Sequence, residues 1–260
     1  MAFIWFALAF PILLMLQRWI HQHLRGLALL ITNKQNWAII LYALILFPGV
    51  LLHELSHWFT ALLLGVRTGT ISLIPKPGRD GSIQLGYVEY YKGSNLGPIR
   101  ESLIGGAPLI AGTAAILLIA FHIFGVESLA VAIQSGDIDQ FTVALGQVFT
   151  TPDFLLWLYL IFVISNAMMP SASDRKAWPA FLVVVGLFVL VLYVVDGELV
   201  VDGLSRPVST LFGFLATAFS LAIGVDFVFM IFIALVEQFI SRIRGVELVY
   251  SQVELPPGKK

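Results

Sequence analysis

Residues 53–57 read His-Glu-Leu-Ser-His, a pattern whose residue types and spacing suit metal-dependent hydrolysis. On a helix, positions i and i+4 lie on the same face, so His53 and His57 can offer ring nitrogens to one metal ion. Glu54 is rotated by about 100° around the helix from His53, so its carboxylate can reach a water on that ion rather than the ion itself. Zinc lowers the pKa of a bound water to about 7, and a carboxylate beside it can take the proton. The motif therefore predicts a zinc site that attacks peptide carbonyls.

The surroundings of this motif are apolar, which strengthens the interpretation. The stretch 37–65 contains a single charged residue, Glu54. A glutamate in the middle of a membrane span costs at least roughly a few kcal/mol unless it is paired. Three ionisable side chains so close together in such a run require a shared partner, and a metal ion is one. The alternative, a chance match on a solvated helix face, does not suit an apolar stretch.

The composition indicates a protein that lies in lipid. Of the 260 residues, 58% are hydrophobic and 12% are charged, whereas a soluble domain carries about 25% charged residues. The net charge of −1 gives no reason to expect a nucleic-acid partner. The chain has no cysteine, so disulfides and cysteine-ligated metals are excluded, and a metal must be held by His, Asp or Glu.

Apolar stretches predict an α-helical integral membrane protein with about six transmembrane helices. The N-terminal stretch 2–16 precedes the first basic residue, Arg18, so we expect a retained membrane segment rather than a cleavable signal peptide. The six expected spans are 2–16 (with a short extension to 20), 37–65, 103–125, 154–169, 177–195 and 207–240.

One segment, 68–91, has the pattern of a small β-hairpin at the cytoplasmic surface. Apolar and polar residues alternate around Ile71 and again around Ile83, and the sequence between them is rich in Pro and Gly. Residues 88–91 are a candidate for a further strand. The expected organisation is an N-terminal membrane segment and connection at 1–36, a metalloprotease core at 37–176, C-terminal transmembrane helices at 177–241 and a cytoplasmic tail at 242–260.

The distribution of Lys and Arg predicts the orientation. Most of them fall in the segments 66–100, 175–176 and 242–260, whereas the loop 126–150 has acidic residues and neither Lys nor Arg. Cytoplasmic loops carry the excess of Lys and Arg. We therefore expect a multi-pass protein of a prokaryotic cell membrane with both termini in the cytoplasm.

Zinc needs a third protein ligand, and the residues by themselves leave three carboxylates as candidates. Asp174 follows the fourth span, on a stretch that Pro170 unwinds; the purely structural alternative is that Asp174 caps the next helix. Asp226 lies in the middle of the last span, and Glu237 lies nearer its cytoplasmic end. Three histidines are expected at the wrong depth for this site: His21, His23 and His122.

The motif at 53–57 and the later stretch 166–174, Asn-Ala-Met-Met-Pro-Ser-Ala-Ser-Asp, together resemble the site-2 protease family of intramembrane metalloproteases. The resemblance covers roughly residues 37–176. It implies that Asp174 is the third zinc ligand and that Asn166 and Pro170 shape the wall that faces the substrate. The sequence departs from the family pattern in two ways: Pro170 comes one residue later, and Arg175 stands where the family usually has glycine.

These observations predict a zinc metalloendopeptidase that cuts transmembrane protein substrates in or near their spans, as in regulated intramembrane proteolysis. Glu54 is expected to act as general base and then as proton donor to the leaving amine. A helical substrate must unwind before it is cut, and the hairpin at 68–91 is a candidate for pairing with it. Two alternatives stay open: a membrane metalloprotease of another lineage that uses Asp226 or Glu237, and a zinc-binding transporter or proteolytically inactive relative.

Overall fold

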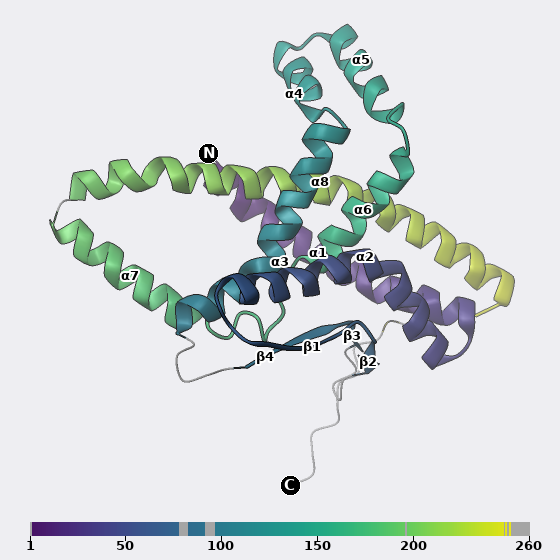
Figure 1. Cartoon of the computed structure of the whole chain (residues 1–260). Coiled ribbons are helices and arrows are strands. Elements are labelled where there is room, and N and C mark those ends of the chain that lie inside the picture. The colour runs from purple at the N-terminus through teal and green to yellow at the C-terminus, as the bar shows by residue number, and fades with distance from the viewer. Residues whose placement is uncertain are drawn as a thin grey trace.

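The computed structural model describes residues 2–77, 83–91, 97–195, 197–246, 248 and 250. Eight α-helices account for most of the described chain (Figure 1). In chain order they are α1 (Ala2–Thr32), α2 (Gln35–Leu63), α3 (Pro98–Leu118, continued by the π-helical turn η1, Ile119–Ile123), α4 (Val126–Ser135), α5 (Ile138–Phe149), α6 (Phe154–Ala167), α7 (Trp178–Val195) and α8 (Gly197–Arg244).

Five of these helices are long and apolar enough to cross a membrane. They are α1, α2, α3 with η1, α7 and the part of α8 from Gly203 to Arg244. The pair α5 and α6 adds a sixth crossing only if the two count as one span, since they meet at an 85° bend. The expected helical architecture is therefore confirmed, and the chain is compatible with a multi-pass membrane protein.

The first, fourth and last expected spans differ from the structure in length; the last, expected at 207–240, lies within the 48 residues of α8. The first is longer than predicted: α1 has 31 residues, so the connection expected before residue 36 is helical as far as Thr32. Its polar residues Gln17 and His21 stay in the helix because they find hydrogen-bond partners inside the bundle. The stretch 154–169 gives a helix of only 14 residues, about 21 Å long and shorter than a hydrocarbon core of about 30 Å.

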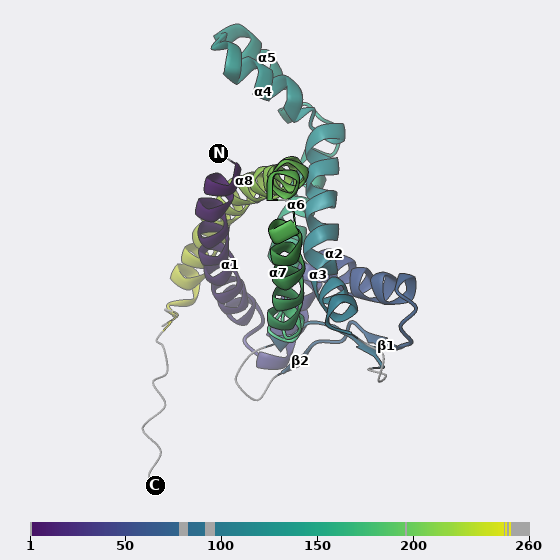
Figure 2. The ribbon, with the colours of Figure 1, turned by 90° about the vertical axis from the view of Figure 1, so that its left-hand side faces the viewer.

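The short helix α6 occupies the centre of the bundle. Its residues from Ile161 to Asn166 are all buried, and α6 packs against α2, α3 and α8. Figure 2 shows α1 lying along α8. Phe162 of α6 stacks on Phe229 of α8 with ring centroids 4.1 Å apart. Lipid tails are as apolar as these side chains, so close packing rather than water exclusion favours the contacts in a membrane.

The expected hairpin is present, but its strands pair differently from the prediction. The outer strands β1 (Thr68–Ser72) and β4 (Tyr87–Tyr90) pair antiparallel, and inside them β2 (Lys76–Pro77) pairs with β3 (Ile83–Gln84). The partner of β1 is therefore the stretch that we considered a further strand. The loop at 78–82 lies outside the described residues. The nested pairing directs Leu73, Ile83 and Leu85 toward the helices, and the sheet lies beside α2 (Figure 1).

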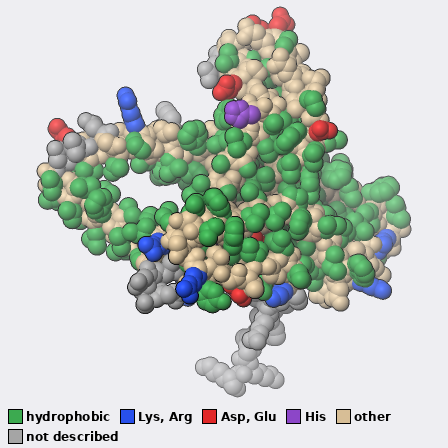
Figure 3. All heavy atoms as spheres, in the orientation of Figure 1, with side chains coloured by type: hydrophobic (Ala, Val, Ile, Leu, Met, Phe, Trp, Pro, Cys, Tyr) green, Lys and Arg blue, Asp and Glu red, His purple; other side chains and the backbone are tan. Residues whose placement is uncertain are grey.

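The charged surface is uneven. Figure 3 shows a face dominated by apolar side chains, with Lys and Arg mainly along the edge near the sheet and acidic side chains on the α4–α5 hairpin. The sheet precedes α3 in the chain and α4 follows η1, so the sheet and the α4–α5 hairpin lie at opposite ends of α3 (Figure 1). If α3 spans the bilayer, these two ends face opposite sides of it. The cytoplasmic assignment of the sheet stays a prediction.

Single cysteines test this orientation, because the native chain has none. Tyr91 beside the sheet is 66% exposed, and Asp139 in α5 is exposed as well. In intact cells, a membrane-impermeant maleimide is expected to label the Asp139→Cys variant and to spare Tyr91→Cys. Inverted membrane vesicles should give the reverse result. Labelling of both variants from one side would contradict the topology.

Candidate metal centre

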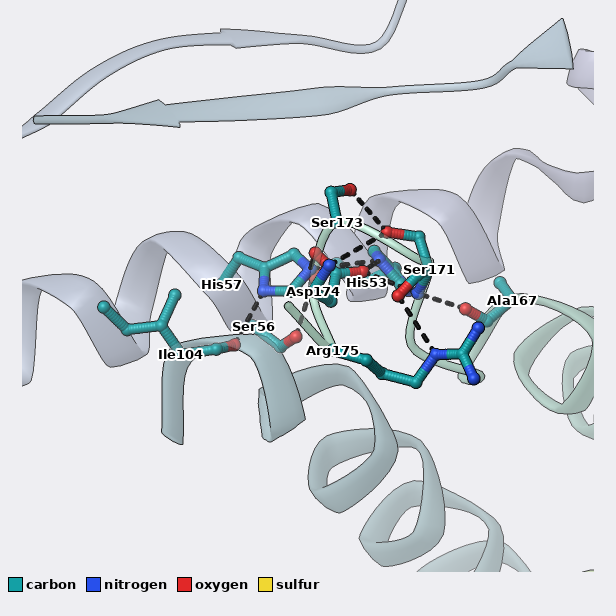
Figure 4. Close-up of polar contacts among 9 residues, drawn as sticks. All are labelled: His53, Ser56, His57, Ile104, Ala167, Ser171, Ser173, Asp174 and Arg175. Carbon is teal, nitrogen blue, oxygen red and sulfur yellow. Dashed lines mark hydrogen bonds and ion pairs between the residues drawn. The ribbon is translucent and has the colours of Figure 1, made fainter. Parts of the chain in front are cut away.

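Three potential ligands converge where α2 passes the loop between α6 and α7. His53 and His57 come from one face of α2, and Asp174 comes from the loop (Figure 4). The Nε2 atoms of the two rings are 3.1 Å apart. Asp174 Oδ1 lies 3.5 Å from Nε2 of His57, and Oδ2 lies 3.8 Å from Nε2 of His53. The structure thus brings together the two histidines and the aspartate that the sequence suggested.

The opposite nitrogen of each ring is bound to a backbone carbonyl. Nδ1 of His53 lies 2.6 Å from the oxygen of Ala167, and Nδ1 of His57 lies 2.8 Å from the oxygen of Ile104. A carbonyl oxygen only accepts hydrogen bonds, so each Nδ1 must carry the hydrogen. In the neutral rings both Nε2 atoms are then bare and point at each other. A backbone carbonyl on the far nitrogen is the usual outer partner of a metal-binding histidine.

This arrangement fits a divalent metal ion. Two bare nitrogens 3.1 Å apart cannot hydrogen-bond to each other, whereas a cation between them satisfies both lone pairs. A tetrahedral zinc site with ligand distances of about 2.0–2.2 Å places its donor atoms about 3.3–3.6 Å apart. The two ring nitrogens are 3.1 Å apart, and one donor atom from each of the three residues lies within 4.8 Å of the others, so small side-chain shifts would close the set around an ion. The single negative charge of Asp174 also complements a divalent ion.

No family model, curated protein or solved structure matches this chain. The support for a metal centre therefore comes from the geometry of its own residues.

The loop that carries Asp174 is held in place locally. The backbone N–H of Ser171 donates to Oδ2 of Asp174 at 2.7 Å, and the N–H of Asp174 faces Oγ of Ser171 at 3.3 Å. Burial raises the pKa of Asp174, but the neighbouring His57 ring and the hydrogen bonds from Ser171 outweigh this effect and hold the pKa at about 2. The carboxyl group is therefore an anion, as a metal ligand must be.

Helix α3 supports the loop from behind. The backbone oxygen of Asp174 lies so close to Gly105 that a Cβ at this glycine would be 2.0 Å from it. Only glycine allows this approach of the loop backbone to the helix. The preceding residue of α3, Ile104, supplies the carbonyl that holds His57. One turn of α3 therefore places both Asp174 and the ring of His57.

The arginine in place of the family's glycine is compatible with this geometry. Among the described residues, the only non-glycine residues with positive φ are Asn33 and Asp153, so Arg175 has a backbone conformation that any residue adopts. Its Nε lies 3.3 Å from the carbonyl oxygen of Ser171 (Figure 4). Arg175 thus contributes to the turn of the loop.

Glu54 lies beside the metal centre, against the backbone of the sheet. Its side chain is buried, with 6% of the residue exposed. A Cβ at Gly86, which joins β3 to β4, would be 2.8 Å from Oε1 and 2.9 Å from Cγ of Glu54. The sheet therefore covers the carboxylate that the motif assigns to proton transfer. The sequence analysis assigned no role to Gly86, since its proximity to Glu54 depends on how the sheet docks on α2.

The other candidate ligands lie in separate contacts. Oδ1 of Asp226 accepts hydrogen bonds from Ser165 at 2.7 Å and from the amide nitrogen of Asn166 at 3.0 Å. Glu237 lies 2.7 Å from His23, and His122 lies in η1 at the far end of α3. The structure therefore favours Asp174 over Asp226 and Glu237 as the third ligand.

The two residues expected to face the substrate are placed differently. The side chain of Asn166 is buried and its amide nitrogen bonds to the carbonyl oxygen of Phe162 and to Asp226. It is therefore engaged between α6 and α8. Pro170 lies in the loop that carries Asp174. A contact of either residue with substrate stays a prediction.

Replacement of one carboxylate at a time tests the ligand set. Asp174→Asn is expected to lower zinc affinity at least about 100-fold, because the loss of a ligand exceeds the 10–100-fold effect of an outer partner. His53→Ala and His57→Ala should act in the same direction. Asp226→Asn, the matched control, should keep about one zinc per chain. Zinc content and chelator competition on the purified full-length variants measure this. The assignment is wrong if Asp226→Asn loses zinc and Asp174→Asn keeps it.

Gly86→Ala tests the contact between the sheet and Glu54. The added methyl group would overlap the Glu54 carboxylate, which must rotate away because it is the more flexible group. We expect zinc to stay bound and any hydrolytic turnover to fall about tenfold or more, within the range of general-base effects. Gly203→Ala is the matched control, since a Cβ at Gly203 meets nothing within 4 Å. Unchanged turnover in Gly86→Ala would show that the sheet does not position Glu54.

Proposed function

We propose that this protein is an intramembrane zinc metalloprotease of the site-2 protease type. One observation carries the proposal: two histidines with fixed tautomers and one aspartate converge on a single point. A buried glutamate follows the first of these histidines on the same apolar helix. This combination supports a hydrolase whose substrates reach it within the membrane.

The proposed chemistry divides among four side chains. His53, His57 and Asp174 would hold the ion. Zinc, when bound, polarises the scissile carbonyl and makes water a nucleophile near neutral pH. Glu54 accepts the proton of the attacking water on its carboxylate and delivers it to the nitrogen of the leaving amine. Burial of Glu54 under the sheet keeps bulk water from competing for that proton.

The substrate class follows from the apolar setting. A transmembrane helix hides its carbonyls in hydrogen bonds and must unwind before it can be cut. Unpaired backbone groups cost several kcal/mol each in hydrocarbon. Within the described residues the outer sheet has only the strands β1 and β4, so each strand keeps one edge free of a strand partner. The sheet packs against α2, and such an edge would offer hydrogen-bond partners to an unwound substrate.

Glu54→Gln tests the activity. The substitution keeps the size of the side chain and removes the proton acceptor, so cleavage should fall about 10²- to 10⁴-fold, as for loss of a general base. Zinc content should stay at the native level. The assay uses the full-length protein in nanodiscs with single-span transmembrane proteins that carry helix-breaking residues. Cleavage by Glu54→Gln at the native rate would refute the protease proposal, and zinc-dependent ion uptake that survives this substitution would favour the transporter instead.

A further inference from the structure

The end of α6 is bound by side chains from two other helices. The last four carbonyls of a helix have no partner within it. The oxygen of Ser165 accepts from Nε2 of Gln17 at 2.6 Å. The oxygen of Asn166 accepts from Nε2 of His21 at 3.1 Å. The oxygen of Ala167 is the one that holds Nδ1 of His53. Three consecutive carbonyls therefore receive one donor each, and the third donor is a ligand of the metal centre.

The two donors on α1 have a defined orientation. Gln17 and His21 are four residues apart, so they lie on the same face of α1. Nε2 of His21 must carry the hydrogen, because its partner is a carbonyl. Nδ1 of His21 is then the acceptor, and it lies 2.7 Å from the hydroxyl of Tyr42, which donates to it. The chain from Tyr42 through His21 to Asn166 thus has one consistent direction.

These contacts lie immediately before the loop that carries Asp174. The chain leaves α6 at Ala167 and reaches Asp174 through 168–173, which are held by contacts within the loop and against α3. A shift of the end of α6 would therefore move the carbonyl that orients His53 and the start of the ligand loop together. On the other side of α6, Ser165 and Asn166 bind Asp226 of α8. Donors from α1 and an acceptor from α8 thus hold the same turn.

We propose that Gln17 and His21 are positioning residues of the metal centre. They cap the end of α6, so that the Ala167 carbonyl keeps the His53 ring in its metal-binding tautomer and the following loop presents Asp174. This role explains why the first apolar helix carries a buried glutamine and a half-buried histidine, each of which needs a partner. The proposal rests on the proposed metal site and does not require that the protein cleaves peptides.

Substitutions of His21 separate the carbonyl contact from general packing. In a glutamine the side-chain nitrogen takes the place of Nε2, which faces the Asn166 carbonyl. In an asparagine the nitrogen takes the place of Nδ1, which faces Tyr42. His21→Gln should therefore preserve the cap, and His21→Asn should lose it. His23→Asn is the matched control, because His23 lies on the same helix and contacts Glu237.

The experiment measures binding of Co²⁺ to the full-length protein in detergent, by titration and by its visible absorption. His21→Asn and Gln17→Leu should each weaken Co²⁺ binding about three- to tenfold, less than loss of a direct outer partner, and shift the absorption bands. His21→Gln and His23→Asn should keep the native affinity and spectrum. Thermal unfolding of the metal-free variants checks that His21→Asn and His23→Asn are equally folded.

Two outcomes overturn the proposal. The first is native affinity and spectrum in both His21→Asn and Gln17→Leu. The second is an equal loss in His21→Gln, His21→Asn and His23→Asn, which would indicate a general effect of altering α1. A native chain that binds no Co²⁺ would instead refute the metal site and, with it, the proposed function.

Discussion

The facing Nε2 atoms of His53 and His57, 3.1 Å apart, are the constraint on which the rest of the site depends. Because each opposite nitrogen is bonded to a carbonyl, the two Nε2 lone pairs face each other, and a metal ion between them would satisfy both. Those carbonyls come from α3 and α6. The Ala167 carbonyl is available because α6 ends there, and the Ile104 carbonyl is available because Pro108, four residues later in α3, has no N–H to donate. The site therefore depends on the packing of several helices, because α2 supplies only the two histidine ligands.

The short length of α6 provides one of these carbonyls. A helix that crossed the whole bilayer would leave its last carbonyls near water. With 14 residues, α6 ends inside the protein, where water cannot satisfy them. Side chains of α1 and α2 take over that role. The carbonyls that lack a partner within α6 thus accept hydrogen bonds from Gln17, His21 and His53. One of these three donors, His53, is a candidate metal ligand.

The sequence predicted the parts of this protein that depend on local pattern. The helical period predicts that His53 and His57 share one face of α2. The membrane spans were predicted from apolar runs whose length matches the thickness of a bilayer. Asp174 was one of three open candidates, and it needed the loop geometry to be favoured. The sequence analysis did not find roles for Gln17, His21 or Gly86, because each depends on how distant segments dock. The spacing of Gln17 and His21 on one face of an apolar helix was the available signal.

Strand pairing was missed for a related reason. Alternation of apolar and polar residues locates strands but does not say which of three candidate stretches pair. The two nested pairs, β1 with β4 and β2 with β3, extend one hairpin and place Gly86 over Glu54. The register that was hardest to predict is therefore the one that brings the sheet to the reactive carboxylate.

Because the candidate metal centre is assembled from several segments, a bound ion would be coupled to the fold. His53 and His57 come from α2, Asp174 from the loop beyond α6, and the outer partners from α3 and α6. Such a set of ligands does not exist in the unfolded chain, so the free energy of metal binding would add to the stability of the folded bundle. At a free metal concentration one hundred times the dissociation constant, the gain in stability would be about 2.7 kcal/mol. The ion that supports the proposed chemistry would then also hold α2, α3 and the end of α6 together, as the capping contacts from α1 do from the other side.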